Sequence, residues 1–392
     1  MNKNILNTGV QTFIKNNLNT DIMSVVLGKT EFDHISSKEL AQQLESKKKC
    51  AFKLPTWFHS ENIFYPPKLN IEQSSSEKTA SYKASLVNGE SLLDLTGGFG
   101  VDSYFFGKKI ADVTMCEINP ELSEIAAHNL KVLQAHNIKV LNADGLYYLN
   151  SSDKIFDWIY IDPSRRDKTS GKVFKLSDCL PDVTKHLDLL LKKSNSILLK
   201  TSPLLDISSG LKDLKSVEEI HIIAVNNEVK ELLWIIRSGN QQEPILKTIN
   251  IKNSSHELFS FKRSEEAKVR SSFTEPLNYL YEPNAAILKA GAFKTIGDQS
   301  DLKKLHEHTH LYTSISKVSF PGRVFKIFST HPYNKKTMAD LNIKKANITI
   351  RNFPLKVADI RKKHKIKEGG ELYLFFVKDL LNNLLLLQCY KA

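Results

Sequence analysis

The sequence predicts an α/β protein built on a mostly parallel, seven-stranded sheet, with a helical region before it and a smaller α+β module after it. Short apolar runs alternate with helical stretches over residues 90–240, and only a short link joins the last two of these runs. Beyond them the chain returns to strand patterns. Strand–helix alternation is typical of a parallel sheet with helices on both faces.

The expected strands are seven short apolar runs: SLLDL, ADVTMCEI, IKVLNA, FDWIYID, NSILLKTS, EEIHIIAV and ELLWIIRS. Helices are expected between them, most clearly in ELSEIAAHNLKVLQAHN and LSDCLPDVTKHLDLLLKK. Only NNEVK links the last two strands, which is too short for a helical crossover, so the final strand should run antiparallel. The sheet is therefore expected to be Rossmann-like, but unlike that of the usual dinucleotide dehydrogenase.

The regions on either side of this sheet follow other patterns. Residues 1–70 are expected to be mainly helical, because SSKELAQQLESKKK opens with a capping-type serine and has leucines at helical spacing. The prolines and aromatics of LPTWFHSENIFYPPKLNIEQSSSE predict an irregular segment, and Ser75 or Ser76 could cap the next helix. After residue 240, strand pairs with short helices predict a small α+β module that ends in a strand, NNLLLLQCYKA.

Length and composition limit the class of protein. The 392 residues predict two or three domains, and 41% hydrophobic with 25% charged residues is typical of a soluble globular protein. No apolar run reaches the roughly 18 residues of a membrane span, and the N-terminus resembles neither a signal nor a transit peptide. The cysteines form no CxxC pair, which fits a reducing cytoplasm and argues against a zinc ribbon: Cys50, Cys116, Cys179 and Cys389.

The positive charge is concentrated in the last third of the chain. The net charge is +12, and residues 262–392 contain 24 Lys+Arg against 12 Asp+Glu, so the preceding residues are neutral overall. Concentrated positive charge favours a polyanion partner, although a solubilising surface would have the same composition. The densest part is RKKHKIK, from Arg361 to Lys367, to which Arg323 and Lys326 could add. A solvated helix end is the ordinary alternative.

Three histidines alternate in HEHTH, at His306, His308 and His310. On a strand their side chains would share one face, where a metal ion could bind. No cysteine lies near them in the sequence, and a solvated or substrate-facing polar stretch is the simpler interpretation. We expect no metal.

The first candidate binding motif is LLDLTGGFGVDS, an apolar strand that breaks into a glycine-rich turn. Glycine permits a tight turn and the close approach of a ligand to the main chain. In open α/β sheets, ligands bind at the carboxyl ends of such strands. The turn lacks the GxGxxG spacing, which argues against a pyrophosphate site and a nicotinamide oxidoreductase.

Two acidic residues follow at the ends of the next two strands. Glu117, in CEINP, could accept both hydroxyls of a ribose, although a strand-end acid at the surface is an alternative. Asp144, in NADG, could accept the exocyclic amine of adenine, with Ala143 and Gly145 supplying backbone contacts. A lone Asp in a loop is usually a turn residue. The ordered series of turn, Glu117 and Asp144 is more specific than any one of its members.

The fourth motif is DPSRR, after the fourth strand. Asp162 could accept a proton or orient a nucleophile, provided that it lies within hydrogen-bond reach. Arg165 and Arg166 could hold a phosphate by paired hydrogen bonds, or else serve as caps or interdomain ion pairs.

In this order and spacing, LDLTGGFGVDS, CEINP, NADG and DPSRR resemble the class I S-adenosylmethionine-dependent methyltransferases. SSSEKTASYKASLV, YLYEPNAAILKAGAF, HLYTS and FPGRVFKI are similar to one bacterial subgroup with C-terminal ferredoxin-like and THUMP-like domains. The resemblance covers residues 70–392. It implies four regions: a helical region at 1–70, a methyltransferase domain at 71–265, a ferredoxin-like segment at 266–315 and a THUMP-like basic domain at 316–392.

The resemblance also implies S-adenosyl-L-methionine as cofactor. Asp94 and the turn glycines would hold the methionine end, Glu117 the ribose and Asp144 the adenine. The residues that this assigns to the cofactor are Asp94, Thr96, Gly97, Gly98, Gly100, Glu117, Ile118, Asp144, Gly145 and Asp162. Asp162 and Arg165 are the candidate catalytic residues.

Amino-directed nucleic-acid methyltransferases have Asp/Asn-Pro-Pro-aromatic where this chain has Asp162-Pro163-Ser164-Arg165. The missing second proline and aromatic argue against methylation of an exocyclic amine, although Phe174 or Tyr160 could replace the aromatic. THUMP domains are associated with RNA, so the resemblance implies a structured RNA substrate, a tRNA or rRNA base, bound by the basic module. Two alternatives stay open: a methyltransferase of proteins or small molecules, and a catalytically inactive RNA-binding protein.

Overall fold

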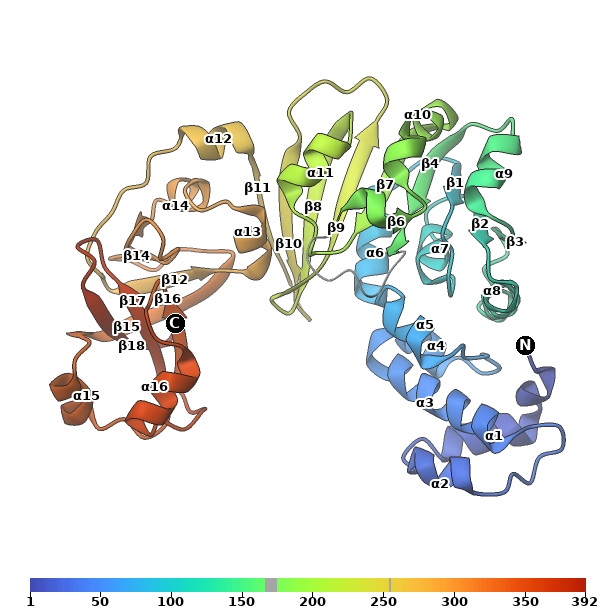
Figure 1. The fold of residues 1–392 in the computed structure, drawn as a ribbon, viewed down its shortest axis with the longest axis horizontal. Helices are drawn as coiled ribbons and strands as arrows, with labels where there is room; N and C mark the ends of the chain where they lie inside the picture. Colours follow the sequence, from blue (N-terminus) through green and yellow to red (C-terminus); the bar gives the residue numbers. More distant parts are fainter. Residues whose placement is uncertain (166–174, 254) are drawn as a thin grey trace. The chain divides into compact units, whose positions relative to one another are not determined.

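The computed structural model describes residues 1–165, 175–253 and 255–392, and the chain divides into two compact units. The first contains Met1–Glu218 and Leu232–Gln242, and the second contains Glu219–Glu231 and Glu243–Ala392. Figure 1 shows the elements of both. No helix among the described residues is long and apolar enough to cross a membrane.

The first unit is organised around a sheet whose strands are the expected apolar runs. Their order is β9-β7-β4-β1-β2-β3, and only the pair of β7 and β9 is antiparallel. The strands are β1 (Ser91–Asp94), β2 (Asp112–Glu117), β3 (Ile138–Asn142), β4 (Phe156–Ile161), β7 (Ser194–Thr201) and β9 (Glu228–Arg237). The predicted fold, including its antiparallel last strand, is confirmed.

The connections between these strands are mainly helical. β1 is buried along its whole length, as expected of a central strand covered on both faces. The helices are α6 (Glu77–Leu86), α7 (Val101–Phe106), α8 (Pro120–Val132), α9 (Gly145–Ser151), α10 (Val183–Lys193) and α11 (Ile207–Asp213). Three short elements lie between β4 and α10: β5 (Ser164–Arg165), η2 (Leu176–Asp178) and β6 (Cys179–Leu180).

The N-terminal region is helical, as predicted, and Ser36 begins its longest helix with a capping box to Glu39. Its elements are η1 (Lys3–Leu6), α1 (Thr8–Asn16), α2 (Ile22–Leu27), α3 (Ser37–Lys53), α4 (Pro55–His59) and α5 (Lys68–Gln73). The segment predicted to be irregular thus contains α4 and α5. The buried Trp57 ring of α4 contacts the rings of Phe99 and Tyr104, so this region packs against the glycine turn.

The second unit begins at Glu219, within β8 (Val217–Val225), and includes the turn that follows this strand. Asn226 and Asn227 both have positive φ angles, of 49° and 67°, which suits a two-residue hairpin turn. β8 pairs in parallel with β10 (Ile245–Ile251), which pairs antiparallel with β11 (His256–Lys262). Helix α12 (Arg263–Lys268) follows.

The rest of this unit is a second sheet, in the order β13-β14-β12-β15-β18-β17-β16. Its strands are β12 (Tyr279–Pro283), β13 (Lys303–Lys304), β14 (Tyr312–Ser314), β15 (Gly322–Pro332), β16 (Asn347–Arg351), β17 (Tyr373–Lys378) and β18 (Leu384–Lys391). Its helices are α13 (Ala285–Ala290), α14 (Thr295–Gln299), α15 (Lys335–Leu341) and α16 (Val357–His364).

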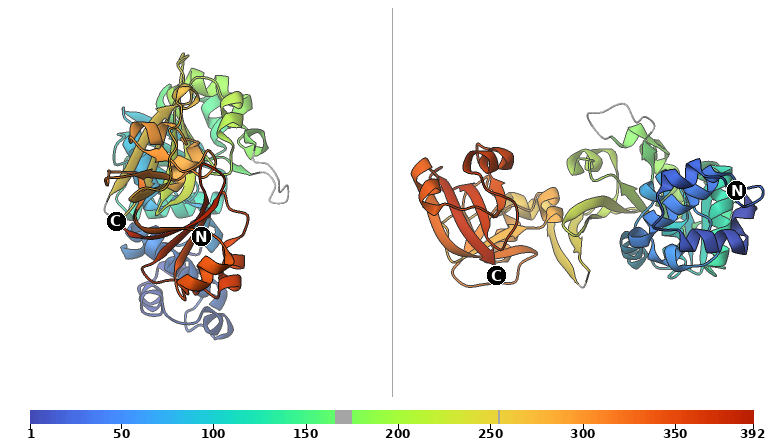
Figure 2. Two further views of the ribbon diagram at one scale, coloured as in Figure 1. Left: turned by 90° about the vertical axis from the view of Figure 1, so that its left-hand side faces the viewer. Right: turned by 90° about the horizontal axis from the view of Figure 1, so that it is seen from below.

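Alternating residues of β17 build two apolar clusters in this sheet. Phe375 and Val377 pack with Leu280 and Leu305, whereas Leu374 and Phe376 pack with residues of α15 and α16. Figures 1 and 2 show α15 and α16 together at one side of the sheet. The predicted pairing of the last two strands is confirmed, because β17 and β18 run antiparallel.

Candidate functional site

The glycine-rich turn joins the end of β1 to α7. The φ angles of Gly98 and Gly100 are +56° and +82°, in the left-handed region that favours glycine. The Gly100 amide donates to the Gly97 carbonyl over 2.9 Å, which closes the turn. A Cβ atom on Gly97 would lie 2.3 Å from the Met115 side chain, so only glycine lets the turn rest directly on β2.

Glu117 connects the end of β2 to this turn. Its Oε2 accepts from the Gly98 amide over 2.8 Å, and its Oε1 accepts from the Asn119 amide over 2.7 Å. The carboxylate is therefore fixed beside the turn by two backbone donors. The neighbouring Ile118 side chain is 68% exposed, so an apolar surface lies next to the acid.

Asp144 and Gly145 lie where β3 meets α9. Asp144 caps α9 by accepting from the Tyr147 amide over 2.9 Å, and it remains exposed. A Cβ atom on Gly145 would lie 2.5 Å from the Leu95 carbonyl oxygen, at the end of β1. The structure thus brings the ends of β1, β2 and β3 together, with the predicted residues on all three.

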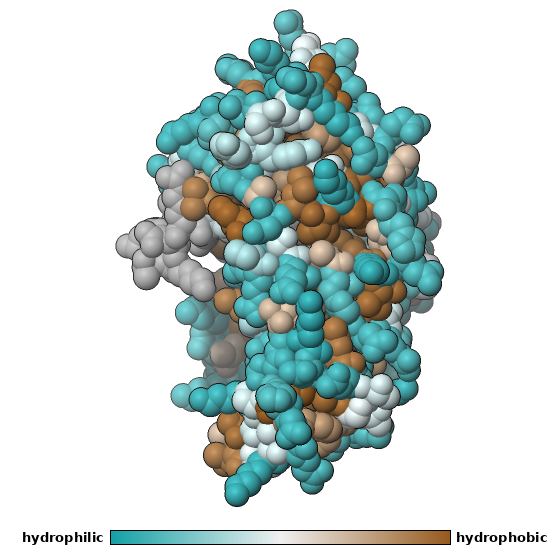
Figure 3. Space-filling view, turned by 90° about the vertical axis from the view of Figure 1, so that its right-hand side faces the viewer, coloured by the Kyte–Doolittle hydropathy of each residue, from teal (hydrophilic) through white to brown (hydrophobic). Residues whose placement is uncertain are grey.

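The surface around these strand ends carries exposed apolar side chains. Tyr147, one turn into α9, is 75% exposed, and Ile118 is similarly open to solvent. Figure 3 faces the β3 edge of the sheet and shows apolar side chains among mainly hydrophilic ones.

Asp94 lies beneath the turn, with a side chain that is 1% exposed. It accepts from the Thr96 amide over 2.9 Å and from the Ser103 hydroxyl over 2.6 Å. Burial raises the pKa of Asp94 to about 7, against the lowering effect of these two hydrogen bonds. Asp94 therefore supports the shape of the turn, and its predicted contact with the methionine end stays a prediction.

Asp162 and Thr96 connect the ends of β4 and β1. The Asp162 amide donates to the Thr96 hydroxyl over 2.7 Å, and the Asp162 carboxylate forms an ion pair with Lys200 of β7 over 2.5 Å. The Arg165 backbone belongs to β5, which pairs with β6. The Arg165 side chain, Arg166 and Phe174 lie outside the described residues. Tyr160, the other candidate aromatic, is fully buried and offers no open ring face.

The sequence analysis missed a buried polar network behind this turn. Lys83 of α6 is fully buried and forms an ion pair with Asp102 of α7 over 2.8 Å. The Ser75 and Tyr160 hydroxyls both donate to the Asp102 carboxylate over 2.8 Å. Burial alone would raise the pKa of Asp102, but the charges of Lys83 and Lys200, together with the hydrogen bonds from Lys83 and Ser75, outweigh it and hold this pKa below its ordinary value.

A signal for this network does exist in the sequence. Thr79, Ala80, Lys83 and Ala84 form the buried stripe of α6. A lysine within a stripe of small, otherwise buried residues indicates a buried partner, because an unpaired ammonium would be costly there.

The basic segment of the second unit has mixed roles. The Arg361 guanidinium donates to the carbonyls of Ala346 and Ile366 and so supports the fold, and the Lys363 ammonium lies 5.4 Å from the centre of the Tyr333 ring. The exposed lysines of the segment are Lys362, Lys363, Lys365 and Lys367.

Arg323 and Lys326 are also exposed, and Arg323 forms an ion pair with the buried Glu282. The nearby aromatics expected in the core are divided, because Phe325 is fully buried whereas Phe328 is 70% exposed.

The HEHTH histidines lie in the turn between β13 and β14 and not on a strand. The His310 ring stacks on Phe293, whereas the His306 and His308 rings lie 5.7 Å apart. Within the described ranges, no group of His, Cys, Asp or Glu side chains could hold a metal ion.

Comparisons with known proteins cover the whole chain. A ferredoxin-like domain model matches residues 279–321, and a THUMP domain-like model matches residues 322–391. The crystal structure of a protein from Porphyromonas gingivalis W83, named a putative methyltransferase, has 33% sequence identity and a TM-score of 0.91. The alignment covers 100% of this chain and 99% of that protein.

Two further solved structures match a smaller part. One is a protein from Escherichia coli, named a putative methyltransferase, with 18% identity and a TM-score of 0.31. The alignment covers 41% of this chain and 85% of that protein. The other is a protein from Streptococcus mutans in complex with SAH, also named a putative methyltransferase, with 11% identity and a TM-score of 0.31. The alignment covers 41% of this chain and 96% of that protein. Scores this low carry no inference about this chain. No curated protein matches it.

Proposed function

The chain belongs to the class I methyltransferase family with C-terminal ferredoxin-like and THUMP-like domains, and from this membership we propose that it transfers a methyl group from S-adenosylmethionine to RNA. The hydrogen bond from the Gly98 amide to the Glu117 carboxylate is the observation that best supports S-adenosylmethionine as the cofactor. This bond joins the glycine turn to the acid that would bind the ribose.

The residues at the strand ends fit this cofactor. The close contacts at Gly97 and Gly145 leave no space for a Cβ, so the turn packs directly on β2 and the start of α9 packs directly on the end of β1. Glu117 would accept the ribose hydroxyls, and Asp144 would accept the adenine amine beside the exposed Ile118. When bound, S-adenosylmethionine supplies a methyl group on a sulfonium that is already a good leaving group, so the protein's contribution is binding and orientation.

Asp162 and Lys200 would lie beside the substrate atom that accepts the methyl group. The Lys200 ammonium already occupies one oxygen of the Asp162 carboxylate, which leaves that carboxylate less able to accept from an amine. The same ammonium would favour a methyl acceptor that carries negative charge, such as a deprotonated oxygen or ring nitrogen. This pairing agrees with the departure of DPSRR from the amino-directed tetrad.

RNA is the acceptor that the second unit supports best. The whole surplus of positive charge lies from Lys262 onward, and the THUMP domain-like match covers residues 322–391. A polyanion gains from such a surface by releasing counterions. A base within a structured RNA would have to leave its stack to reach the strand ends.

Methyl transfer to fractionated cell extract tests the proposal. The full chain with methyl-labelled S-adenosylmethionine should place label in nuclease-sensitive, protease-resistant material. Asp162→Asn should lower this transfer at least about tenfold, because the Lys200 ammonium loses the negative charge of its partner. Asp153→Asn makes the same change at an exposed position before the opposite end of β4 and should leave transfer unchanged. Label in nuclease-resistant material would instead indicate a protein or small-molecule acceptor.

The occupied Asp162 carboxylate also favours a second candidate, an RNA-binding protein that has lost the reaction. Binding of both RNA and S-adenosylmethionine without any transfer, in wild type and in Lys200→Gln alike, would select this candidate.

A further inference from the structure

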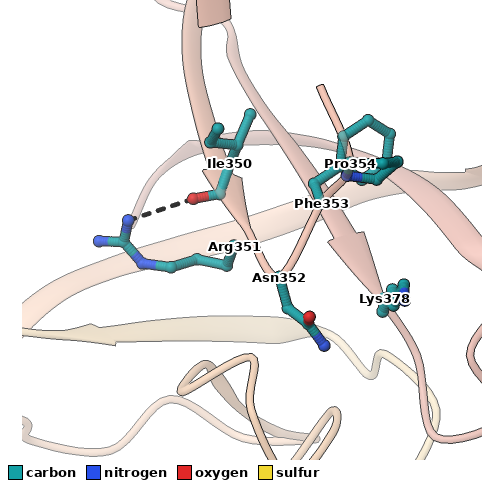
Figure 4. Close-up of a pocket in the computed structure, with 6 residues that line it drawn as sticks. All are labelled: Ile350, Arg351, Asn352, Phe353, Pro354 and Lys378. Carbon is teal, nitrogen blue, oxygen red and sulfur yellow. Dashed lines mark hydrogen bonds between the residues drawn. The ribbon is translucent and has the colours of Figure 1, made fainter. Parts of the chain in front are cut away.

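A surface pocket of about 490 Å³ lies in the second unit, at the carboxyl ends of β16 and β17. These two strands are parallel, with Arg351 opposite Val377, and α16 connects them. The carboxyl ends of parallel strands are where open α/β sheets bind ligands. The lining residues are Ile350, Arg351, Asn352, Phe353, Pro354 and Lys378 (Figure 4).

Arg351 is held in place by a buried acid. Its Nη2 donates to Glu282 Oε1 over 2.7 Å, and its Nη1 donates to the Ile350 carbonyl over 3.1 Å. Glu282 is itself buried and also accepts from Arg323, so two guanidinium groups share one carboxylate. Arg351 lies opposite Val377 and so shares its face of the sheet, whereas Lys378, the next residue of β17, lies on the other face with Phe376.

Two further polar groups complete the lining. The Lys378 ammonium has no ion-pair partner in the part of the chain that the structure describes. The Asn352 amide lies 3.2 Å from His306 Nδ1, which also accepts from the His308 amide and is therefore unprotonated. The Asn352 nitrogen must then be the donor, which leaves its carbonyl oxygen as an acceptor. Phe353 and Pro354 add an apolar wall.

We propose that this pocket binds one nucleotide of single-stranded RNA, with its phosphate at Lys378 and its base against Phe353 and the Asn352 carbonyl. The inference rests on the proposed function, which makes RNA the substrate. The pocket has the mixture that a nucleotide requires: a cationic donor for phosphate, one acceptor for a base edge, and an apolar surface for stacking.

This pocket lies beside the basic cluster RKKHKIK. The Tyr333 ring lies 5.2 Å from the Phe353 ring of the pocket and 5.8 Å from the His364 ring of the cluster. The Lys363 ammonium lies 5.4 Å from the centre of the same Tyr333 ring. The cluster offers diffuse charge on exposed lysines, and the pocket offers a defined place for one nucleotide.

Binding of a labelled single-stranded RNA hexamer to the full chain, measured by fluorescence anisotropy, tests this inference. Lys378→Gln should weaken binding roughly tenfold, since it removes a charge-assisted hydrogen bond. Lys378→Gln removes no internal bond of its own side chain and so guards against misfolding. Lys335→Gln removes the same charge from an exposed position of α15 and should weaken binding no more than about threefold. Adenosine monophosphate should compete with the hexamer, and adenosine should not.

Equal weakening of binding by Lys378→Gln and Lys335→Gln would contradict nucleotide binding in the pocket. Equal competition by adenosine monophosphate and adenosine would contradict it as well. These outcomes are independent of methyl transfer. A pocket that binds the hexamer while label fails to enter RNA contradicts the proposed function alone. Label in RNA with no effect of Lys378→Gln contradicts the pocket alone.

Discussion

Gly145→Ala tests whether the ends of β1 and β3 must lie in close contact. Gly145 begins α9, and an added Cβ would lie 2.5 Å from the Leu95 carbonyl oxygen and 2.8 Å from its Cα. Both atoms belong to backbone, which cannot rotate away as a flexible side chain can. The start of α9 would have to retreat by roughly 0.9 Å to reach ordinary contact at about 3.4 Å.

The expected cost follows from this overlap. Extra atoms forced into a well-packed position destabilise proteins by about 1–3 kcal/mol, and the backbone on both sides of this contact favours the upper half of that range. Asp144 immediately precedes Gly145 and caps α9, so the retreat would displace its carboxylate. We therefore expect Gly145→Ala to weaken S-adenosylmethionine binding at least about tenfold, equivalent to about 1.4 kcal/mol.

Urea unfolding and titration calorimetry with S-adenosylmethionine measure the two effects. Gly239→Ala is the matched control, because Gly239 has a φ of +78° but no heavy atom within 4 Å of an added Cβ. The control should lose about 1 kcal/mol from its left-handed backbone and bind the ligand as wild type does. If Gly145→Ala binds S-adenosylmethionine with wild-type affinity at wild-type stability, the reasoning about the strand ends is refuted.

Two further predictions concern the buried carboxylates behind the turn. The pKa of Asp94 is about 7 in the folded protein against an ordinary value of 3.8, so between these values the folded state holds a proton that the unfolded chain releases. The stability that this proton contributes is complete below about pH 4. It is lost as the pH rises to about 7, at up to about 1.4 kcal/mol per pH unit. Urea unfolding from about pH 5 to about pH 8 should show this decline, and Asp94→Asn should flatten it; a decline of equal slope in the variant would exclude Asp94 as its source. Lys83→Met should destabilise the fold by about 3–5 kcal/mol, because Asp102 keeps a buried charge without its ammonium, and the double variant Lys83→Met/Asp102→Asn should recover most of this loss. A Lys83→Met protein within about 1 kcal/mol of wild type in urea would contradict the importance of the pair.

The strand order near the site could be predicted from local patterns. The expected strands have short apolar runs, and the direction of β9 followed from the brevity of the link at Asn226 and Asn227. The glycines of the first turn were recognisable for the same local reason, since positive φ angles at Gly98 and Gly100 leave glycine as the favoured residue.

Features that depend on distant contacts were not predictable. The segment around Trp57 looked irregular because of its prolines and aromatics, yet Pro55 begins α4, and the Trp57 ring is buried against Phe99. The partner of Lys83 lies 19 residues along the chain, and its pairing with Asp102 appears only when α6 and α7 pack together. The burial of Asp94 was not expected from the sequence either, and its contact with the methionine end stays a prediction.

The pocket of the second unit was missed for a related reason. Its lining combines residues 350–354 with Lys378, which become neighbours only through the parallel pairing of β16 and β17. Sequence reading favoured the RKKHKIK run because charge density is visible along the chain. Arg361 in that run is partly engaged with backbone carbonyls, which its sequence context does not reveal.

Titration calorimetry of the full chain with S-adenosylmethionine, compared between wild type and Glu117→Gln, tests most directly whether a nucleoside binds at these strand ends. Glu90→Gln is the control, since Glu90 is exposed and precedes β1 at the opposite edge of the same sheet. We expect one bound ligand per chain, a loss of at least about tenfold in affinity for Glu117→Gln, and no change for Glu90→Gln. Binding that is equally strong in Glu117→Gln, or no binding to the wild type, would contradict the assignment.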